Sequence, residues 1–322
     1  MNKIKFLAGA LALSALAFLG CEKENQIVTS PGLENENEVI ADDNEPDLIP
    51  KSRAESIASS GQTIYGLTVA NRLVQFSSDD PDEIISRRRI TGLQSGERLL
   101  GIDFRPATGQ LYGLGSSSRL YVIDTWSAQA SPIGAQSFSP GLSGSAFGFD
   151  FNPTVDRIRI VSNNGQNLRV HPDLGTVVDF DPATAGTQTD LNLAYDNTAN
   201  DGDPVDVNAG RTPSVVGAAY TNPDNNPATG TTLYDLDAAL NTLVIQAPPN
   251  NGTLNTVATI AFNSFQENFL GFDIAPSGTA YVAGWDGRRN VLATLDLISG
   301  RVSILGRIDT RASITGLATP AP

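Results

Sequence analysis

A short alternation of hydrophobic and polar positions recurs along this chain. The clearest copy is Leu99–Pro106, Leu-Leu-Gly-Ile-Asp-Phe-Arg-Pro, and close copies stand at Ala146–Pro153 and Phe269–Pro276. Weaker copies stand at Val215–Pro223 and Ile314–Pro320. Side chains two residues apart share one face of a β-strand, so the alternation predicts a strand at each copy. A unit that returns at intervals of this size is typical of a repeat architecture.

Each strong copy of the motif opens a block of four predicted strands. Short hydrophobic runs follow it, with Gly, Ser, Asn or Asp at the joints, as in strands connected by tight turns. After the first motif strand we expect Gln110–Leu114, Arg119–Asp124 and Ala130–Gly134. The other three blocks are predicted at Phe147–Phe151, Arg157–Ser162, Asn167–His171 and Thr176–Phe180; Val216–Tyr220, Thr232–Leu236, Thr242–Gln246 and Asn255–Ile260; and Leu270–Ala275, Thr279–Ala283, Val291–Asp296 and Arg301–Leu305.

The two ends of the repeat region complete one further block. Thr63–Thr68 matches a second strand, Leu73–Phe76 and Ile84–Ile90 supply the third and fourth, and the missing first strand is Ile314–Thr319. A blade shared by both ends closes a ring without exposed edges, which a β-sandwich or an open solenoid does not require. We therefore predict an all-β fold, a β-propeller of five four-stranded blades whose first blade is closed by the C-terminal strand. The connector Asp181–Pro213 leaves room for a sixth blade.

The first twenty-one residues have the pattern of a bacterial lipoprotein signal. Lys3 and Lys5 precede the apolar run Phe6–Leu19, which is shorter than the roughly 20 residues that span a bilayer. The run ends in Phe18-Leu19-Gly20-Cys21, which resembles a lipobox, with Phe18 in place of the usual Leu. The resemblance implies removal of residues 1–20 and lipidation of Cys21. The alternative is an ordinary signal peptide followed by an unrelated cysteine.

Residues 21–60 are predicted to be a disordered acidic tether, and residues 61–322 the propeller domain. The tether is rich in Glu, Asp, Asn, Pro and Ser, and its few apolar residues follow no period. Glu22-Lys23-Glu24 resembles the export signals of surface lipoproteins. We therefore expect a protein of the bacterial cell envelope, attached to the outer membrane through its lipid and exposed at the cell surface.

Composition excludes several classes of function. The 322 residues carry a formal net charge of −14, which argues against a nucleic-acid partner. The single cysteine forms no internal disulfide, and the single histidine excludes zinc sites with several histidines. Ser-His-Asp chemistry would depend on His171 alone, which stands beside a turn, where a surface hydrogen-bonding role is favoured.

Three stretches are similar to a known family. They are Gly101–Gly115, Phe147–Arg159 and Pro248–Leu254. On these motifs the region from Gln62 to Leu317 resembles the bacterial domain-of-unknown-function 4394 family. The resemblance implies a secreted or surface protein of propeller-like sequence. It implies no activity and no catalytic residue that can be transferred to this chain.

Asp103, Asp150 and Asp273 each stand two residues after a motif glycine. On a propeller they would lie near the central axis, where three carboxylates could bind a cation. Ala219 and Ala318 occupy the same position in the other two blocks, which leaves such a ring incomplete. Because a residue that recurs from blade to blade usually serves architecture, we favour bonds to turn N–H groups or to a neighbouring strand.

The connector after the second full block is the most individual stretch of the chain. Between Asp190 and Asn208 it is dense in oxygen-bearing side chains, and Gly202 permits a sharp turn. The candidate calcium ligands are Asp196, Asn200, Asp201, Asp203, Asp206 and Asn208. Their spacing does not match an EF-hand, and a solvated turn loop is the favoured alternative.

Two tryptophans and an arginine run are further candidates. Trp126 and Trp285 are expected in turns, where an exposed indole suits a sugar or a peptide or else covers the edge of a blade. Arg87–Arg89 falls on the predicted outermost strand of the first blade, where charges keep an edge from pairing.

Three functional hypotheses remain, and the first is favoured. The first is a non-catalytic recognition module, displayed on a tether, that binds a glycan, a peptide or an envelope protein. The second is a carboxylate- or calcium-dependent hydrolase, of the glycosidase or the lactone and ester type, acting on envelope or extracellular substrates. The third is a purely structural envelope component. Calcium is the only candidate cofactor.

Overall fold

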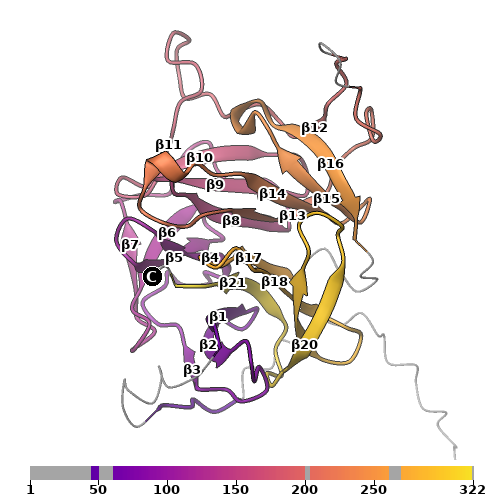
Figure 1. The fold of residues 1–322 in the computed structure, drawn as a ribbon. Coiled ribbons are helices and arrows are strands. Elements are labelled where there is room, and N and C mark those ends of the chain that lie inside the picture. Colours follow the sequence, from indigo (N-terminus) through magenta and orange to yellow (C-terminus); the bar gives the residue numbers. More distant parts are fainter. Residues whose placement is uncertain (1–44, 51–60, 200–203, 261–269, 321–322) are drawn as a thin grey trace, which may run out of the picture. The chain divides into compact units, whose positions relative to one another are not determined.

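A computed structural model describes residues 45–50, 61–199, 204–260 and 270–320 (Figure 1). The chain divides into two units, Met1–Glu38 and Val39–Pro322, and the described residues all belong to the second. Residues 1–20 and the predicted lipidation site Cys21 therefore lie outside the described residues. Within the described ranges the regular elements are strands and two short 3₁₀ helices, and no helix is long and apolar enough to cross a membrane.

The strands form five sheets, each of which is one blade of a β-propeller. Blade 1 contains β21 (Ile314–Ala318), β1 (Thr63–Thr68), β2 (Arg72–Ser77) and β3 (Ser86–Arg89). Blade 2 contains β4 (Leu99–Arg105), β5 (Gln110–Gly115), β6 (Arg119–Ile123) and β7 (Ala130–Ile133). Blade 3 contains β8 (Phe147–Asn152), β9 (Arg157–Ser162), β10 (Asn167–His171) and β11 (Thr176–Val177).

Blades 4 and 5 follow the same order from the axis outward. Blade 4 contains β13 (Val215–Tyr220), β14 (Leu233–Asp237), β15 (Thr242–Gln246) and β16 (Thr253–Thr259). Blade 5 contains β17 (Leu270–Ile274), β18 (Ala280–Trp285), β19 (Asn290–Leu295) and β20 (Val302–Ile308). The 3₁₀ helices are η2 (Pro227–Thr229) and η3 (Pro249–Asn251), both in blade 4. The predicted five blades are confirmed.

The first blade is closed by the C-terminal strand, as the sequence predicted. β21 pairs antiparallel with β1, so that Tyr65 stands opposite Ala318. In the described part of the connector 181–213, the one strand is β12 (Ala194–Tyr195), which joins the outer edge of β16 in parallel. The connector thus adds a fifth strand to blade 4 and does not form a sixth blade.

The motif glycines let the first strands of the blades pack closely around the axis. A Cβ atom on Gly148 would lie 2.6 Å from the backbone nitrogen of Ala218 in the next blade. One on Gly271 would lie 2.8 Å from the carbonyl carbon of Gly316. Because these neighbours are backbone atoms that cannot move aside, a larger residue does not fit at either position.

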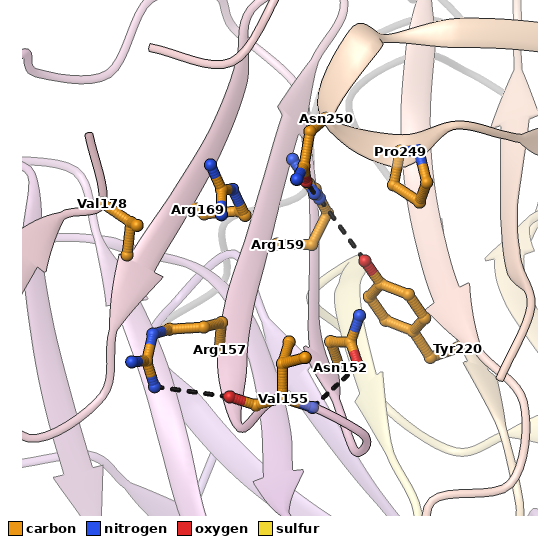
Figure 2. Close-up of a pocket in the computed structure, with 9 residues that line it drawn as sticks. All are labelled: Asn152, Val155, Arg157, Arg159, Arg169, Val178, Tyr220, Pro249 and Asn250. Atoms are coloured by element: carbon orange, nitrogen blue, oxygen red, sulfur yellow. Dashed lines mark hydrogen bonds between the residues drawn. The ribbon is translucent and has the colours of Figure 1, made fainter. Parts of the chain in front are cut away.

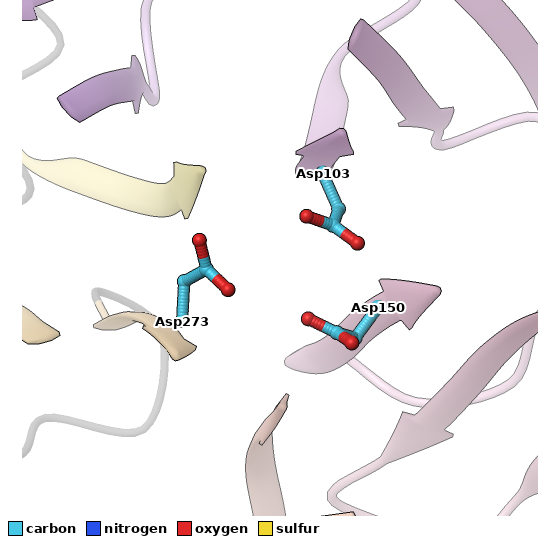
Figure 3. Close-up of side chains that lie close together, drawn as sticks. All are labelled: Asp103, Asp150 and Asp273. Carbon is cyan, nitrogen blue, oxygen red and sulfur yellow. The ribbon is translucent and has the colours of Figure 1, made fainter. Parts of the chain in front are cut away.

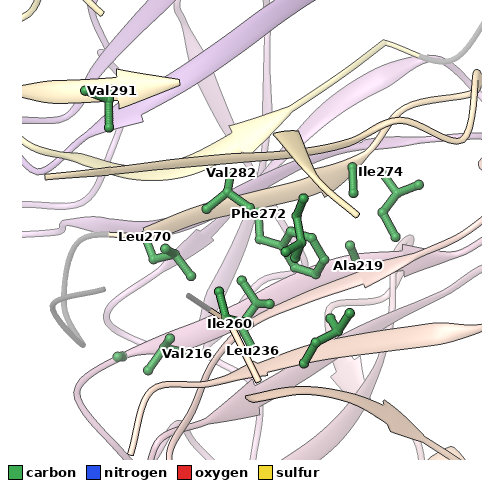
Figure 4. Close-up of a cluster of buried hydrophobic side chains, with 13 residues drawn as sticks. Val216, Ala219, Leu236, Ile260, Leu270, Phe272, Ile274, Val282 and Val291 are labelled. Atoms are coloured by element: carbon green, nitrogen blue, oxygen red, sulfur yellow. The ribbon is translucent and has the colours of Figure 1, made fainter. Parts of the chain in front are cut away.

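The hydrophobic residues of the motif fill the space between adjacent blades. At the interface of blades 4 and 5, Val216 and Leu236 belong to one cluster with Phe272 and Val282 (Figure 4). Each of the other four interfaces holds a cluster of the same kind. Burial of one such side chain stabilises the fold by about 1.5–3 kcal/mol, so the interfaces make the ring a rigid support for its loops.

Residues 45–50 lie along the outer strand of blade 1. Leu48 and Arg87 exchange both backbone hydrogen bonds, at 2.8 and 2.9 Å. These six residues are ordered against the blade, whereas the sequence predicted a disordered tether. The arginines of β3 were expected to keep this edge from pairing, but the edge pairs with Leu48. The physical reason is charge complementarity, since Glu45 and Asp47 pair with arginines of blade 1. The rest of residues 21–60 lies outside the described ranges.

Candidate functional site

The three motif carboxylates face one another around the propeller axis (Figure 3). One oxygen from each of Asp103, Asp150 and Asp273 lies within 4.8 Å of the other two. All three side chains are at most 6% exposed. Each stands two residues after its motif glycine, so glycine and aspartate share the face of the strand that packs on the next blade.

Each axial carboxylate accepts a backbone hydrogen bond from the next blade. The amide of Phe151 donates to Asp103 at 2.8 Å. The amide of Tyr220 donates to Asp150 at 3.0 Å, and the amide of Thr319 donates to Asp273 at 2.5 Å. Asp103 and Asp273 also accept the amide of the residue that follows them. These bonds join the first strands of neighbouring blades, which is the architectural role that the repetition of the motif favoured.

The axial site disfavours negative charge. Burial, together with repulsion from Asp273, raises the pKa of Asp103 well above its ordinary value. Burial and repulsion from Asp103 act on Asp150 in the same direction and raise its pKa. Burial raises the pKa of Asp273 to about 6, against the lowering effect of the bonds from Thr319. The fold thus favours the protonated form of these carboxyl groups over the charged form.

The axial oxygens are also the described group that best fits a metal ion. Two oxygens bound to one Ca²⁺ at about 2.4 Å lie no more than about 4.8 Å apart, which agrees with the separation found here. Three carboxylates supply only part of the six to eight oxygens that Ca²⁺ prefers. Ala219 and Ala318 offer none in the other two blades, so the architectural role of the axial carboxylates stays favoured over a calcium site.

The predicted calcium ligands of the connector are only partly described. Asn200, Asp201 and Asp203 lie outside the described residues. The Asp206 carboxylate accepts the amide and the hydroxyl of Thr256 in β16, at 2.5 and 2.9 Å. Asn208 donates to the same hydroxyl at 3.0 Å.

The third described member of that set makes a local bond. Asp196 accepts the amide and the hydroxyl of Thr198, which lowers the pKa of Asp196. Asp196, Asp206 and Asn208 thus hold the connector together and against blade 4. A calcium ion in the connector remains a prediction.

The two tryptophans do not share a site. Trp126 lies in the turn between β6 and β7, with the Arg88 guanidinium 4.9 Å from its ring centre. Trp285 is the last residue of β18, paired with Asn290, and not part of a turn as predicted. Trp126 of blade 2 thus lies against an arginine of the outer strand of blade 1.

A cavity of about 400 Å³ lies between blades 3 and 4 (Figure 2). We call it the arginine pocket, and its wall is formed by Asn152, Val155, Arg157, Arg159, Arg169, Val178, Tyr220, Pro249 and Asn250. Among these described lining residues there are three guanidinium groups and no carboxylate. This composition stands out in a chain of net charge −14.

Strand register explains why the arginines gather. Arg157 and Arg159 are two residues apart on β9, which places them on one face, and Arg169 of β10 stands directly opposite Arg159. Like charges directly opposite on neighbouring strands repel each other. Asp190 from the connector offsets this repulsion, because it binds Arg159 at 2.7 Å and Arg169 through two nitrogens at 2.8 Å.

Behind the pocket wall lies a dense polar layer. Arg159 is 2% exposed and donates to Asn167 at 2.6 Å and to Asn250 at 2.8 Å, as well as to Asp190. The side chain of Asp190 is fully buried. Arg159 is thus fixed by partners from both blades and orients the pocket wall.

Asp235 of β14 is a fully buried neighbour of this layer. Within the described structure neither of its oxygens has a hydrogen-bond partner, and burial raises the pKa of Asp235 to about 8, against the lowering effect of Arg159. Burial thus favours the uncharged form of Asp235. Asp190 is the carboxylate that bonds both Arg159 and Arg169.

Two arginines keep hydrogen-bonding capacity toward the cavity. In the described structure Arg157 donates only to the backbone carbonyls of Val155 and Asp156 and pairs with no carboxylate. Arg169 bonds Asp190 through Nε and Nη2, which leaves its Nη1. The wall is therefore rich in donors and cationic, which favours an anion.

Sequence reasoning did not find this pocket. The Arg-Ile-Arg run of β9 falls within the family-like stretch Phe147–Arg159, and Asp190 begins the oxygen-rich part of the connector, but neither indicates a pocket by itself. A signal was present, because charged residues at alternating positions within an otherwise buried strand need partners. Their partners Asp190 and Asn250 are 31 and 91 residues away from Arg159.

Comparisons with known proteins identify a family and assign no activity. Residues 72–318 match the family described as Domain of unknown function (DUF4394). No curated protein matches the sequence.

Two solved structures show a distant likeness. A protein of unknown function from Bacteroides thetaiotaomicron is 15% identical, with a TM-score of 0.44, over 83% of this chain and 62% of its own. This chain thus spans less than two thirds of that protein's length. A chain of a nidogen/laminin complex is 11% identical, with a TM-score of 0.45, over 80% of this chain and 98% of its own.

Proposed function

This chain belongs to the DUF4394 family, whose description states no function, and from its own residues we propose that it is a recognition module that binds a small sugar acid in the arginine pocket. The observation that carries the proposal is the wall itself. It combines three guanidinium groups with no carboxylate among its described members. The propeller then acts as a rigid scaffold, and residues of blades 3 and 4 determine which ligand is bound.

Charge and hydrogen bonding support an anionic group on the ligand. A guanidinium binds a carboxylate through two parallel N–H donors, and such charge-assisted bonds are the stronger kind. Arg157 has no carboxylate partner in the described structure, and Arg169 presents one further nitrogen. A ligand carboxylate between these two side chains would accept hydrogen bonds from both guanidinium groups.

The rest of the wall supports a sugar ring. A cavity of about 400 Å³ suits a ligand of monosaccharide size and lies near the lower end of small-molecule pockets. Pro249, which is half-buried, offers an apolar surface for the C–H face of such a ring, and the edge of the buried Tyr220 lies beside it. The side-chain amides of Asn152 and Asn250 can bond its hydroxyl groups.

The hydrolase hypothesis receives less support from the same site. A glycosidase needs an acid–base pair of carboxylates separated by about 5–9.5 Å across the substrate. No carboxylate is among the described residues that line the arginine pocket. The axial carboxylates are within 4.8 Å of one another and at most 6% exposed, which leaves no room for a sugar between them.

Titration of the full mature chain with glucuronate, followed by NMR or calorimetry, tests the proposal. We expect saturable binding of glucuronate and at least about tenfold weaker binding of glucose, because the loss of one charge-assisted pair is worth about 1.5–3 kcal/mol. Inorganic phosphate serves as a second probe and separates binding of any small anion from binding of a sugar acid. Equal affinity for glucose and glucuronate, or no binding of either, would contradict the proposal.

Two variants localise the effect. Arg157→Ala removes a pocket guanidinium, and Arg288→Ala removes an exposed one from the β18–β19 turn of blade 5 with the same change in net charge. We expect only Arg157→Ala to weaken glucuronate binding. Equal losses in both variants would show that the overall charge, and not the pocket, attracts the anion.

We further propose that the module is carried on the bacterial outer membrane by lipid at Cys21. The lipobox-like residues 18–21 at the end of the apolar run support this proposal. Metabolic labelling with a fatty-acid analogue should mark the wild-type protein and leave Cys21→Ser unmarked. Labelling of both proteins, or of neither, would contradict it.

A further inference from the structure

The outer edge of blade 1 is occupied by the acidic segment of residues 45–50. We propose that this edge is a docking site for an extended acidic strand and that residues 45–50 are its built-in, releasable occupant. We call the segment the clasp. This inference does not depend on the arginine pocket or on the lipid anchor.

The clasp is held first by backbone pairing. The amide of Leu48 donates to the carbonyl of Arg87 at 2.8 Å, and the amide of Arg87 donates to the carbonyl of Leu48 at 2.9 Å. This is the antiparallel pairing of a strand added to a sheet edge. β3 is a short strand at the edge of its blade, and unpaired edges of this kind accept a further strand.

Charge selects an acidic occupant. Glu45 forms an ion pair with Arg87 at 2.7 Å, with side-chain exposures of 7% and 13%. Asp47 forms an ion pair with Arg72 at 2.6 Å, where the Arg72 side chain is 6% exposed. Because the Arg87 side chain is largely buried, a docked strand without a carboxylate opposite it would leave this guanidinium unneutralised.

The spacing of the acidic residues matches the extended backbone. Glu45 and Asp47 are two residues apart, so both side chains lie on one face of the segment. Asp47 also accepts the amide of Arg89 at 3.2 Å, and the Arg87 Nε donates to the carbonyl of Pro46 at 3.1 Å. The edge therefore recognises the pattern acid-x-acid followed by a residue with a free amide.

Glu45 also reaches the segment that leads into the ring-closing strand. Its second carboxylate oxygen accepts the amide of Arg311 at 3.4 Å, three residues before β21 begins. Blade 4 has its own added strand, but β12 joins β16 in parallel, and no ion pair holds it among the described residues. Among the described residues, an acidic segment held by ion pairs is thus found at blade 1, the blade that contains both the first strands and the last strand of the chain.

Release of the clasp should leave the edge open to the same sequence supplied from outside. The test uses the full chain with Glu45→Gln, Asp47→Asn and Leu48→Pro together, which removes both carboxylates and the amide that bonds Arg87. We expect exchange of the Arg87 amide to accelerate at least about tenfold, the factor that corresponds to about 1.4 kcal/mol, while amides of β1 and β2 keep their protection. Unchanged exchange at Arg87 would overturn the proposal.

A synthetic peptide of residues 44–51 tests whether the opened edge binds this sequence when it is added separately. We expect it to bind the released variant and not the wild-type chain, and we expect a peptide with Gln and Asn in place of Glu45 and Asp47 to bind at least tenfold more weakly. No binding, or equal binding of the two peptides, would refute an acid-selective edge.

Should the variant fail to fold, the wild-type chain still tests the idea, because raising NaCl from about 0.05 to about 1 M screens the ion pairs. Exchange at Leu48 should then accelerate, and a lack of salt dependence would contradict the proposal.

Discussion

The ring of axial carboxylates and the arginine pocket are both buried polar sites, and they arise in opposite ways. The axial aspartates come from one motif that recurs, and each accepts a backbone amide of the next blade. The arginine pocket takes side chains that no other blade repeats, and these side chains bond one another across blades 3 and 4. Both sites lie where neighbouring blades meet, so location between blades does not separate them.

The difference lies in what the polar groups still have to bind. The axial carboxylates are almost completely buried and satisfied by the fold. In the pocket, Arg157 bonds only two backbone carbonyls among the described residues, and it borders a cavity of about 400 Å³. The repeated residues therefore build the ring, and the residues that break the repeat provide a surface for a ligand.

The largest effect is expected from removal of the carboxylate that holds the pocket arginines. Asp190→Asn leaves Arg159 and Arg169 opposite each other without a counter-charge, and the loss of one partner from a buried ion pair costs about 3–5 kcal/mol. Chemical denaturation at pH 7 measures the free energy of unfolding. A loss below about 1 kcal/mol would show that Asp190 does not organise the pocket.

A steric change at the axis should be next in size. Gly148→Ala brings a Cβ to 2.6 Å from the backbone nitrogen of Ala218, and overpacking of this kind costs about 3 kcal/mol. Gly316→Ala is the matched control, because its nearest contact is 3.3 Å. We expect thermal unfolding to show a much larger loss for Gly148→Ala. Equal losses would contradict the close packing of first strands.

The buried carboxyl groups give stability an unusual dependence on pH. Asp235, with a pKa of about 8, and Asp273, with a pKa of about 6, hold their protons more tightly in the folded state than in the unfolded state. The folded state then binds more protons between about pH 4 and pH 8, so the free energy of unfolding falls as pH rises through that range. We expect a loss of a few kcal/mol between pH 5 and pH 8, measured by denaturation.

Asp235→Asn removes the charge that forms at the higher pH, and we expect this variant to lose less stability between pH 5 and pH 8. Glu83→Gln, at an exposed position, should retain the wild-type profile. A wild-type protein that becomes more stable between pH 5 and pH 8 would show that the buried carboxyl groups do not dominate the dependence.

Much of the fold could be predicted from the sequence because its signals are local. The alternation in Leu99–Pro106 and the turn residues between strands lie within a few residues of one another. The orphan motif at the C-terminus revealed the shared blade, because a repeat that lacks its first strand must find it elsewhere. The repetition of Asp103, Asp150 and Asp273 likewise pointed to an architectural role.

The pocket and the clasp could not be predicted in the same way, because both depend on distant partners. Arg159 meets Asn250 from a residue 91 positions away. Arg87 bonds Pro46, 41 positions earlier, within a stretch whose composition alone resembles a disordered tether. Composition and period describe a segment by itself and do not show which charged edge it will meet.

Repeated polar residues of this propeller build the ring, and unrepeated polar residues bind the ligand. Glucuronate titration of Asp150→Asn and Arg157→Ala, side by side with the wild-type chain, separates these two roles. Asn at position 150 retains the oxygen that accepts the Tyr220 amide, so binding should equal that of wild type. Arg157→Ala should lose at least about tenfold in affinity, with its stability within about 0.5 kcal/mol of wild type. Loss of binding in Asp150→Asn with retention in Arg157→Ala would contradict the claim.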